Sequence, residues 1–147
     1  MKLRGIDHIC IAVKDLEKAR RVYEEDLGLE LHCTYVAESE KIRVARYYIG
    51  DSLAGSGQAV ALELMEPTAP DSEVARFIEK RGEGFFLISY RVDNVDEALA
   101  ELKAKGRQLI DEKPRQLMGC RYAFIHHPKE LCGILTELLD GEFDLGE

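Results

Sequence analysis

The chain has 147 residues, of which 46% are hydrophobic and 33% charged, a length and composition that fit one domain able to bury roughly 70% of its unfolded surface. Its formal net charge of −8 opposes a general nucleic-acid role, which needs a basic stripe to displace counterions. The N-terminus runs into a strand pattern without the apolar segment of a secretory signal, and no apolar run approaches the ~20 residues of a membrane span, so we expect a cytoplasmic protein outside the membrane.

The first half of the chain predicts a βαβββ unit. Residues 6–13 alternate as in a strand, with Ile9, Ile11 and Val13 on one face and His8, Cys10 and Ala12 on the other. Asp15 is a plausible N-cap for a helix that runs through Leu27, and Gly28 can end it. Three further strands are expected at residues 29–36, 42–49 and 59–65.

A connector and a second unit of the same plan follow. Pro67 and Pro70 interrupt the pattern, and Asp71 can cap a short connector helix within residues 71–82. A strand at 85–92 then precedes a helix that is capped by Asn94 and ends at Gly106. Strands are expected near 107–110, 122–125 and 134–139, and residues 140–147 are expected to form a loose tail.

The two units repeat each other, and this repeat predicts the fold and a site. Residues 7–19 align with residues 86–98 at a constant offset of 79 (86 − 7 and 98 − 19), which sets His8 on Leu87. We expect one domain, residues 1–147, of the α+β class, with modules at about 5–67 and 84–140 joined by a connector helix at about 71–82. The modules would form a curved, open, barrel-like sheet whose concave central cavity carries His8, Leu87, Glu63 and Glu137.

Two carboxylates inside apolar strands need an explanation. Glu63 and Glu137 lie in matching last strands of the two units, and burying an ionised carboxylate costs several kcal/mol unless it is paired or coordinated. A divalent metal held by His8, Glu63 and Glu137 would offset that cost, and this donor set suits Co, Mn, Ni, Fe or Zn. Solvent exposure or a salt bridge is the alternative.

Cysteine and cation placement is less specific. The four cysteines form no Cys-x-x-Cys pair and are expected to be reduced, structural thiols. Basic residues cluster locally, and they form either a solvated face or a substrate-binding site. The candidates for substrate binding are Arg76, Lys80, Arg115, His127 and Lys129.

Several segments resemble, in order, those of the vicinal oxygen chelate (glyoxalase/bleomycin resistance/dioxygenase) superfamily, and most of all those of methylmalonyl-CoA epimerases. They are residues 6–9 (IDHI), 63–67 (ELMEP), 71–72 (DS), 77–84 (FIEKRGEG), 127–129 (HPK) and 133–138 (GILTEL). The resemblance implies a glyoxalase-like fold and metal ligation by His8 and Glu137, with Glu63 as a further ligand in some members. It also implies an acyl-CoA substrate and a homodimer.

The chain departs from the epimerase pattern at two positions. The epimerases have a metal-binding histidine where this chain has Leu87, and their proposed second acid/base, a Glu, falls near Val44 in an ungapped alignment. Neither side chain can donate a lone pair or exchange a proton. An imidazole from His126-His127 could replace the missing ligand.

Three functions therefore remain open. The first is a metal-dependent epimerase or isomerase of a 2-substituted malonyl-CoA-type thioester, acting through an enolate, with Glu137 or Glu63 as proton carrier and with altered or lost activity because of Leu87. The second is a lyase or isomerase acting on another small oxyanion substrate. The third is a metal-free protein that binds a small molecule.

Overall fold

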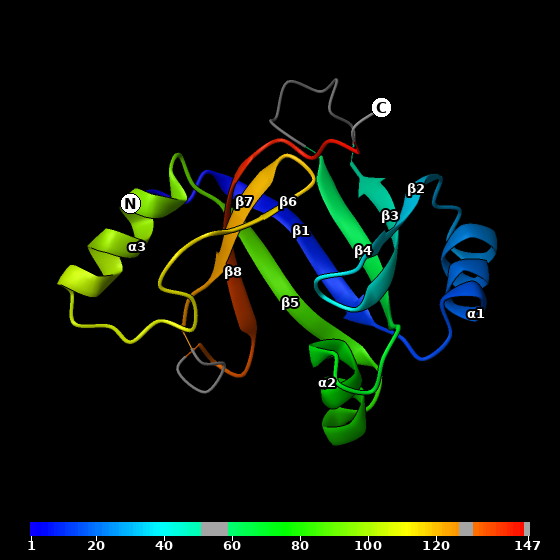
Figure 1. The fold of residues 1–147 in the computed structure, drawn as a ribbon. Coiled ribbons are helices and arrows are strands. Elements are labelled where there is room, and N and C mark those ends of the chain that lie inside the picture. The colour runs from blue at the N-terminus through cyan, green and yellow to red at the C-terminus, as the bar shows by residue number, and fades with distance from the viewer. Residues whose placement is uncertain (51–58, 127–130, 146–147) are drawn as a thin grey trace. The chain divides into compact units, whose positions relative to one another are not determined.

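The computed structural model describes residues 1–50, 59–126 and 131–145. Its elements, shown in Figure 1, are β1 (Gly5–Ala12), α1 (Leu16–Arg21), the π-helical turn η1 (Val22–Asp26), β2 (Leu31–Ala37), β3 (Ile42–Ile49), β4 (Val60–Pro67), α2 (Glu73–Arg81), β5 (Gly84–Arg91), α3 (Val95–Ala104), β6 (Arg115–Leu117), β7 (Cys120–Phe124) and β8 (Leu135–Gly141). The order βαβββ occurs twice, so the predicted α+β class and the two-module plan are confirmed. The chain forms two compact units, one of residues 8–86 and one of residues 1–7 with 87–147.

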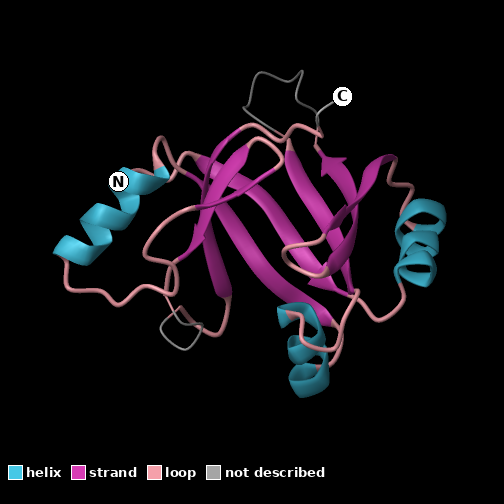
Figure 2. Ribbon diagram, in the orientation of Figure 1, coloured by secondary structure: helices cyan, strands magenta, loops and turns pink. Residues whose placement is uncertain are grey.

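In the unit of residues 8–86, the strands lie in the order β2-β3-β4-β1. β1 runs parallel to β4, and the other neighbours are antiparallel. One face of this sheet packs against α1 and η1, which lie together at one side of the strands in Figure 2. The core between them consists of Val13, Leu16, Ala45, Tyr47, Leu62 and Leu64, with Ile9 and Ile11 packed against it.

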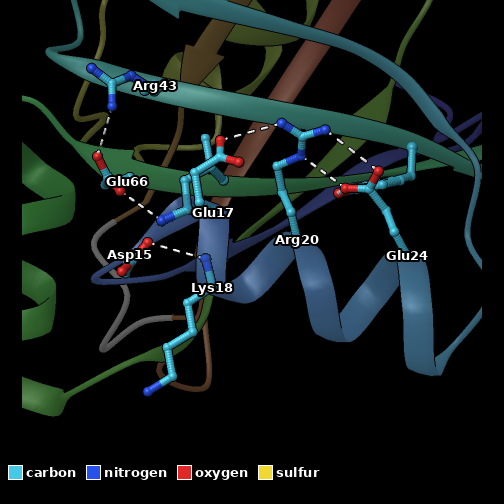
Figure 3. Close-up of polar contacts among 9 residues, drawn as sticks. Asp15, Glu17, Lys18, Arg20, Glu24, Arg43 and Glu66 are labelled. Carbon is cyan, nitrogen blue, oxygen red and sulfur yellow. Dashed lines mark hydrogen bonds and ion pairs between the residues drawn. The ribbon is translucent and has the colours of Figure 1, made fainter.

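Polar contacts hold the start of α1, and Figure 3 shows them. Asp15 is the N-cap, as predicted, and its carboxylate accepts a hydrogen bond from the Lys18 backbone N–H at 3.1 Å. Glu66 of β4 accepts from the Leu16 backbone N–H at 2.6 Å. The helix is thereby fixed to the sheet at its first turn, where backbone N–H groups lack partners within the helix.

The predicted α-helix does not continue regularly to Leu27. Residues 22–26 form a π-turn, in which the Leu27 N–H bonds the Val22 carbonyl at 3.1 Å. Within this turn Glu24 accepts from Arg20 Nε at 2.8 Å and from the Tyr47 hydroxyl at 3.0 Å. Burial and this hydrogen bond raise the pKa of Tyr47 to about 12, so the hydroxyl stays protonated as it ties η1 to the core face.

The connector helix begins one residue later than predicted. Ser72, not Asp71, is the N-cap of α2: its backbone is extended and its hydroxyl accepts from the Ala75 N–H at 2.9 Å. The Asp71 carboxylate forms an ion pair with Lys41 instead. The predicted cap was therefore wrong by one residue, and the Asp71 carboxylate is engaged by a residue distant in the chain.

In the other unit, the strands lie in the order β5-β8-β7-β6, with β5 parallel to β8. α3 packs on this sheet through Val95, Ala98, Leu99 and Leu102. Asn94 caps the helix as predicted, accepting from the Glu97 N–H at 3.0 Å.

Two predictions for this unit are wrong. Residues 107–110 do not form a strand; the Ile110 N–H bonds the Ile125 carbonyl at 2.7 Å, but the first edge strand is β6 at Arg115–Leu117. The tail is not loose at its start, because β8 continues to Gly141. Asp140 accepts hydrogen bonds from Arg121 and from the Val95 N–H, and these long-range contacts extend the strand.

Strand register shows that the repeat extends to side-chain pairs. Cys10 of β1 is the Cα partner of Glu63 on β4, and Ser89 of β5 is the Cα partner of Glu137 on β8. Cys10 and Ser89 are related by the same offset of 79 (89 − 10) as His8 and Leu87. Each carboxylate therefore occupies the same register position in its own module.

Candidate functional site

The polar residues of module one gather on the sheet face opposite α1. His8 and Cys10 lie on β1 and Glu63 lies beside them on β4, and all three are buried. One potential ligand atom from each lies within 4.8 Å of the others. The strand alternation predicted this division, because the intervening Ile9 and Ile11 pack into the core on the other face.

The Glu63 carboxylate is held on both of its oxygens. Oε2 accepts from the Tyr35 hydroxyl at 2.6 Å and from Arg46 Nη1 at 3.0 Å. Oε1 accepts from Cys10 Sγ at 3.6 Å and lies 3.7 Å from His8 Nε2. A buried carboxylate needs compensation, and within module one Arg46 supplies it.

Arg46 is a buried cation that sequence analysis missed. Its side chain is 4% exposed and lies on β3, directly opposite Glu63 in the β3–β4 register. Burial opposes its charge, but attraction to Glu63 and a hydrogen bond to the Tyr48 hydroxyl outweigh this and raise the pKa of Arg46. It therefore stays protonated and forms a buried ion pair with Glu63.

Aromatic side chains complete the surroundings. Burial, and then the neighbouring Glu63 charge, raise the pKa of Tyr35 well above its ordinary value, so it acts as a hydrogen-bond donor to Glu63. The Arg46 guanidinium lies 5.1 Å from the centre of the Tyr48 ring, and the His32 ring meets Tyr48 edge to face at 4.8 Å. The β2 bulge between Leu31 and Cys33 accompanies this contact.

The matching position in module two has different chemistry. Glu137 is buried and accepts from the Ser89 hydroxyl at 2.8 Å. Leu87 is buried at the position equivalent to His8, and Phe124 is opposite Glu137 in the register position that Arg46 has opposite Glu63. The prediction that Glu137 joins His8 and Glu63 in one metal site links the two units and stays a prediction.

The described donors of module one fit the metal that the family resemblance implies. Ligand atoms about 2.0–2.3 Å from a tetrahedral ion lie about 3.3–3.8 Å from one another. His8 Nε2 and Glu63 Oε1, at 3.7 Å, satisfy that spacing. Because Tyr35 and Arg46 engage Oε2, Glu63 would bind through Oε1 alone.

The predicted substrate-binding cations differ in availability. Arg76 and Lys80 are exposed on α2, and Arg76 pairs with Glu73 at 3.0 Å. Arg115 is held by Asp111 at 2.9 Å and lies over the Phe124 ring. His127 and Lys129 lie outside the described residues. His126, the other residue of the proposed substitute ligand pair, is described, and its buried Nδ1 has no hydrogen-bond partner among the described residues.

The missed residues are Cys10, Tyr35, Arg46 and Ser89. Cys10 was detectable, because it follows His8 by two residues and therefore shares its face of the strand. Placing Tyr35 and Arg46 beside Glu63 requires the β2–β3–β4 register, which the sequence does not fix because a long connection separates β3 from β4.

No helix in the described ranges has the length and apolarity required to cross a membrane.

Comparisons with known proteins agree with this architecture. A family model described as Glyoxalase/Bleomycin resistance protein/Dioxygenase superfamily matches residues 7–124. The chain is 39% identical over 143 residues to the uncharacterized protein YqjC of Bacillus subtilis, covering 97% of this chain and 96% of that protein. It is 32% identical over 139 residues to mitochondrial methylmalonyl-CoA epimerase of Mus musculus, covering 93% of this chain and 73% of that protein.

Solved structures match over nearly the whole chain. A methylmalonyl-CoA epimerase in complex with methylmalonyl-CoA and NH4+ has a TM-score of 0.85 at 36% identity, covering 99% of this chain and 97% of that one. The epimerase of Mycobacterium tuberculosis has a TM-score of 0.81 at 33% identity, covering 95% and 89%. These matches confirm the expected glyoxalase-like fold. Together with the family match, they show that the chain belongs to the glyoxalase/bleomycin resistance protein/dioxygenase superfamily.

Proposed function

We propose that this protein is an epimerase-like enzyme that exchanges the proton at C2 of a 2-substituted malonyl-CoA-type thioester, with a divalent metal held by His8, Glu63 and Glu137. The observation that carries the proposal is the buried contact of His8 with Glu63, in a chain that is similar over almost its full length to methylmalonyl-CoA epimerases. One of these similar structures contains methylmalonyl-CoA, which supports an acyl-CoA as the substrate.

The chemistry needs charge stabilisation and proton exchange. A bound metal would polarise the thioester carbonyl and the neighbouring carboxylate, which lowers the energy of the enolate formed when the C2 proton leaves. Inversion then requires a proton carrier on each face of C2, or one carrier and a water. Val44 is a fully buried aliphatic residue of β3, so it cannot act as one of these carriers.

Glu137 is the better proton carrier of the two glutamates. Glu63 has both oxygens engaged by neighbouring side chains, among them the buried guanidinium of Arg46. Glu137 accepts from the Ser89 hydroxyl, which fixes the orientation of its carboxyl group. We therefore assign proton transfer to Glu137, in addition to its proposed place among the metal ligands, and ligation alone to Glu63.

The CoA portion of the substrate needs cations on the protein surface. Arg76 and Lys80, one turn apart on the exposed side of α2, are the candidates for its phosphates. Arg115 is a weaker candidate, because Asp111 and Phe124 already engage it.

Deuterium exchange tests the proposal directly. Incubation with methylmalonyl-CoA in deuterated water should place deuterium at C2 faster than in buffer alone. Glu137→Gln should slow this exchange by about 10²–10⁴-fold, whereas the exposed Glu142→Gln should leave it unchanged. Exchange at the buffer rate with wild-type protein, or full activity of Glu137→Gln, would refute the assignment.

Leu87→His tests the expected joining of the modules. If the duplicated plan brings residue 87 to the metal of His8, an added imidazole should tighten metal binding by a large factor, measured by competition with a chelator. Unchanged affinity would refute that geometry.

Arg46 supports a second candidate function, a metal-free protein that binds a small molecule. The guanidinium already compensates the Glu63 charge, which removes one of the reasons to expect a metal. Elemental analysis of unchelated protein separates the two: about one transition-metal ion per chain supports the enzyme, and none supports the binding protein.

A further inference from the structure

We propose that Cys10 is a metal ligand of this chain, so that module one presents an imidazole, a thiolate and a carboxylate to a zinc-class ion. The inference deepens the proposed function, with which it shares the metal site. It assigns to Cys10 a role that differs from the structural thiol expected from sequence.

The backbone places Cys10 beside both other donors. It follows His8 by two residues on β1, so both side chains leave the same face of the strand. It is also the Cα partner of Glu63 in the parallel β1–β4 ladder. All three donors lie on two paired strands rather than on loops, so the geometry of the sheet sets the spacing between them.

The donor atoms lie at distances that one ion can bridge. Cys10 Sγ is 3.6 Å and His8 Nε2 is 3.7 Å from the same oxygen, Glu63 Oε1. All three donor atoms are within 4.8 Å of one another, whereas ligands of a tetrahedral ion lie about 3.3–3.8 Å apart. Closing the widest pair to that spacing takes a combined movement of at most about 1–1.5 Å, shared between the His8 and Cys10 side chains.

Charge gives a thiolate a role at this position. Arg46 compensates the buried Glu63 charge, so Glu63 attracts a divalent ion less strongly than an unpaired carboxylate would. Cys10 adds one negative charge when its sulfur binds the ion and its proton passes to the solvent buffer. The thiolate therefore restores the attraction that Arg46 removes.

The chemical types of the three donors limit which metal ions the site prefers. Thiolate and imidazole favour Zn²⁺ and its spectroscopic substitute Co²⁺, whereas Mn²⁺ and Mg²⁺ prefer oxygen donors. The expected order of affinity is thus Zn²⁺ and Co²⁺ well above Mn²⁺.

Cobalt titration of the full-length, metal-stripped protein tests the inference without any turnover. Wild-type protein should bind one Co²⁺ per chain and develop the near-ultraviolet absorption of a sulfur-to-cobalt charge transfer. X-ray absorption of the zinc form should show one sulfur at about 2.3 Å. Cys10→Ser should abolish both signals and weaken zinc binding by at least about 100-fold, above the 10–100-fold cost of losing an outer partner.

Cys33→Ser is the matched control. Cys33 is partly buried on β2 of the same unit but is not among the clustered donors, so this variant should keep the absorption and the affinity. Circular dichroism of Cys10→Ser and of a second variant, Cys10→Ala, checks that both fold. Cobalt binding without a sulfur signal in wild-type protein, no cobalt binding, or a signal that survives in folded Cys10→Ser or Cys10→Ala overturns the inference.

The outcome is separable from that of the proposed function. A cysteine-dependent cobalt signal without deuterium exchange at C2 upholds the ligand and refutes the epimerase. Deuterium exchange without a sulfur signal upholds the epimerase and refutes Cys10 as a ligand.

Discussion

Removing Arg46 should show how much free energy of unfolding is lost when the buried Glu63 charge has no cationic partner. The two side chains are 4% and 3% exposed, and Nη1 lies 3.0 Å from Oε2. Loss of one partner of a buried ion pair typically costs 3–5 kcal/mol, because the other charge stays buried and uncompensated. Tyr35 still donates to Glu63 at 2.6 Å, so Arg46→Met should lower the free energy of unfolding by about 3 kcal/mol, at the low end of that range.

Urea unfolding measures this effect. With an m-value of roughly 1.5 kcal/mol/M, a loss of about 3 kcal/mol lowers the midpoint by about 2 M. The matched control is Arg43→Met on the same strand, whose pair with Glu66 is exposed on the arginine side and spans 3.3 Å. That variant should lose no more than about 1 kcal/mol.

A double-mutant cycle separates the ion pair from simple packing loss. Glu63→Gln removes the charge and retains an acceptor for Tyr35, so Arg46→Met combined with Glu63→Gln should be more stable than Arg46→Met alone. We expect a coupling energy of about 2 kcal/mol, within the range seen for contacting residues. Additive effects, or an Arg46→Met loss no larger than that of Arg43→Met, would refute the argument that Arg46 compensates Glu63.

Three further predictions concern local structure and pH. Ser72→Ala should lower the free energy of unfolding by about 1 kcal/mol through loss of the α2 cap, and Asp71→Ala by less; the reverse order in urea unfolding would restore Asp71 as the cap. Gly141→Ala should cost about 2 kcal/mol or more, because Gly141 has φ +88° and an added Cβ would lie 2.5 Å from the Gly119 carbonyl oxygen; unchanged thermal stability would contradict that clash. The raised pKa of Tyr47, about 12, predicts stability that is complete below pH 10 and declines as the pH rises toward 12, because the unfolded state loses its proton first; Tyr47→Phe should flatten this decline, and an unchanged pH profile would refute it.

Local signals in the sequence were sufficient for most of the elements. The alternation at β1, the Asp15 and Asn94 caps and the apolar face of Ile9 and Ile11 depend on residues close together in the chain, and the structure confirms each of them. The predictions that failed depended on distant partners. Ser72 rather than Asp71 caps α2, and Asp71 pairs with the distant Lys41. Asp140 belongs to β8 rather than to a loose tail, and its carboxylate is held by Arg121 and by the Val95 N–H.

The sequence by itself determined the βαβββ plan, its duplication, and the candidates His8, Glu63 and Glu137, because periodicity and repeat spacing are properties of the chain alone. Only the tertiary structure decided what surrounds Glu63. Arg46 and Tyr35 reach it across the β2–β3–β4 register, and Cys10 is beside it through the β1–β4 ladder. Strand register depends on how the whole faces of the sheet pack. The sequence shows that Glu63 lies in an apolar strand, where burying its charge is costly, but the partners that compensate this charge come together only when the sheet forms.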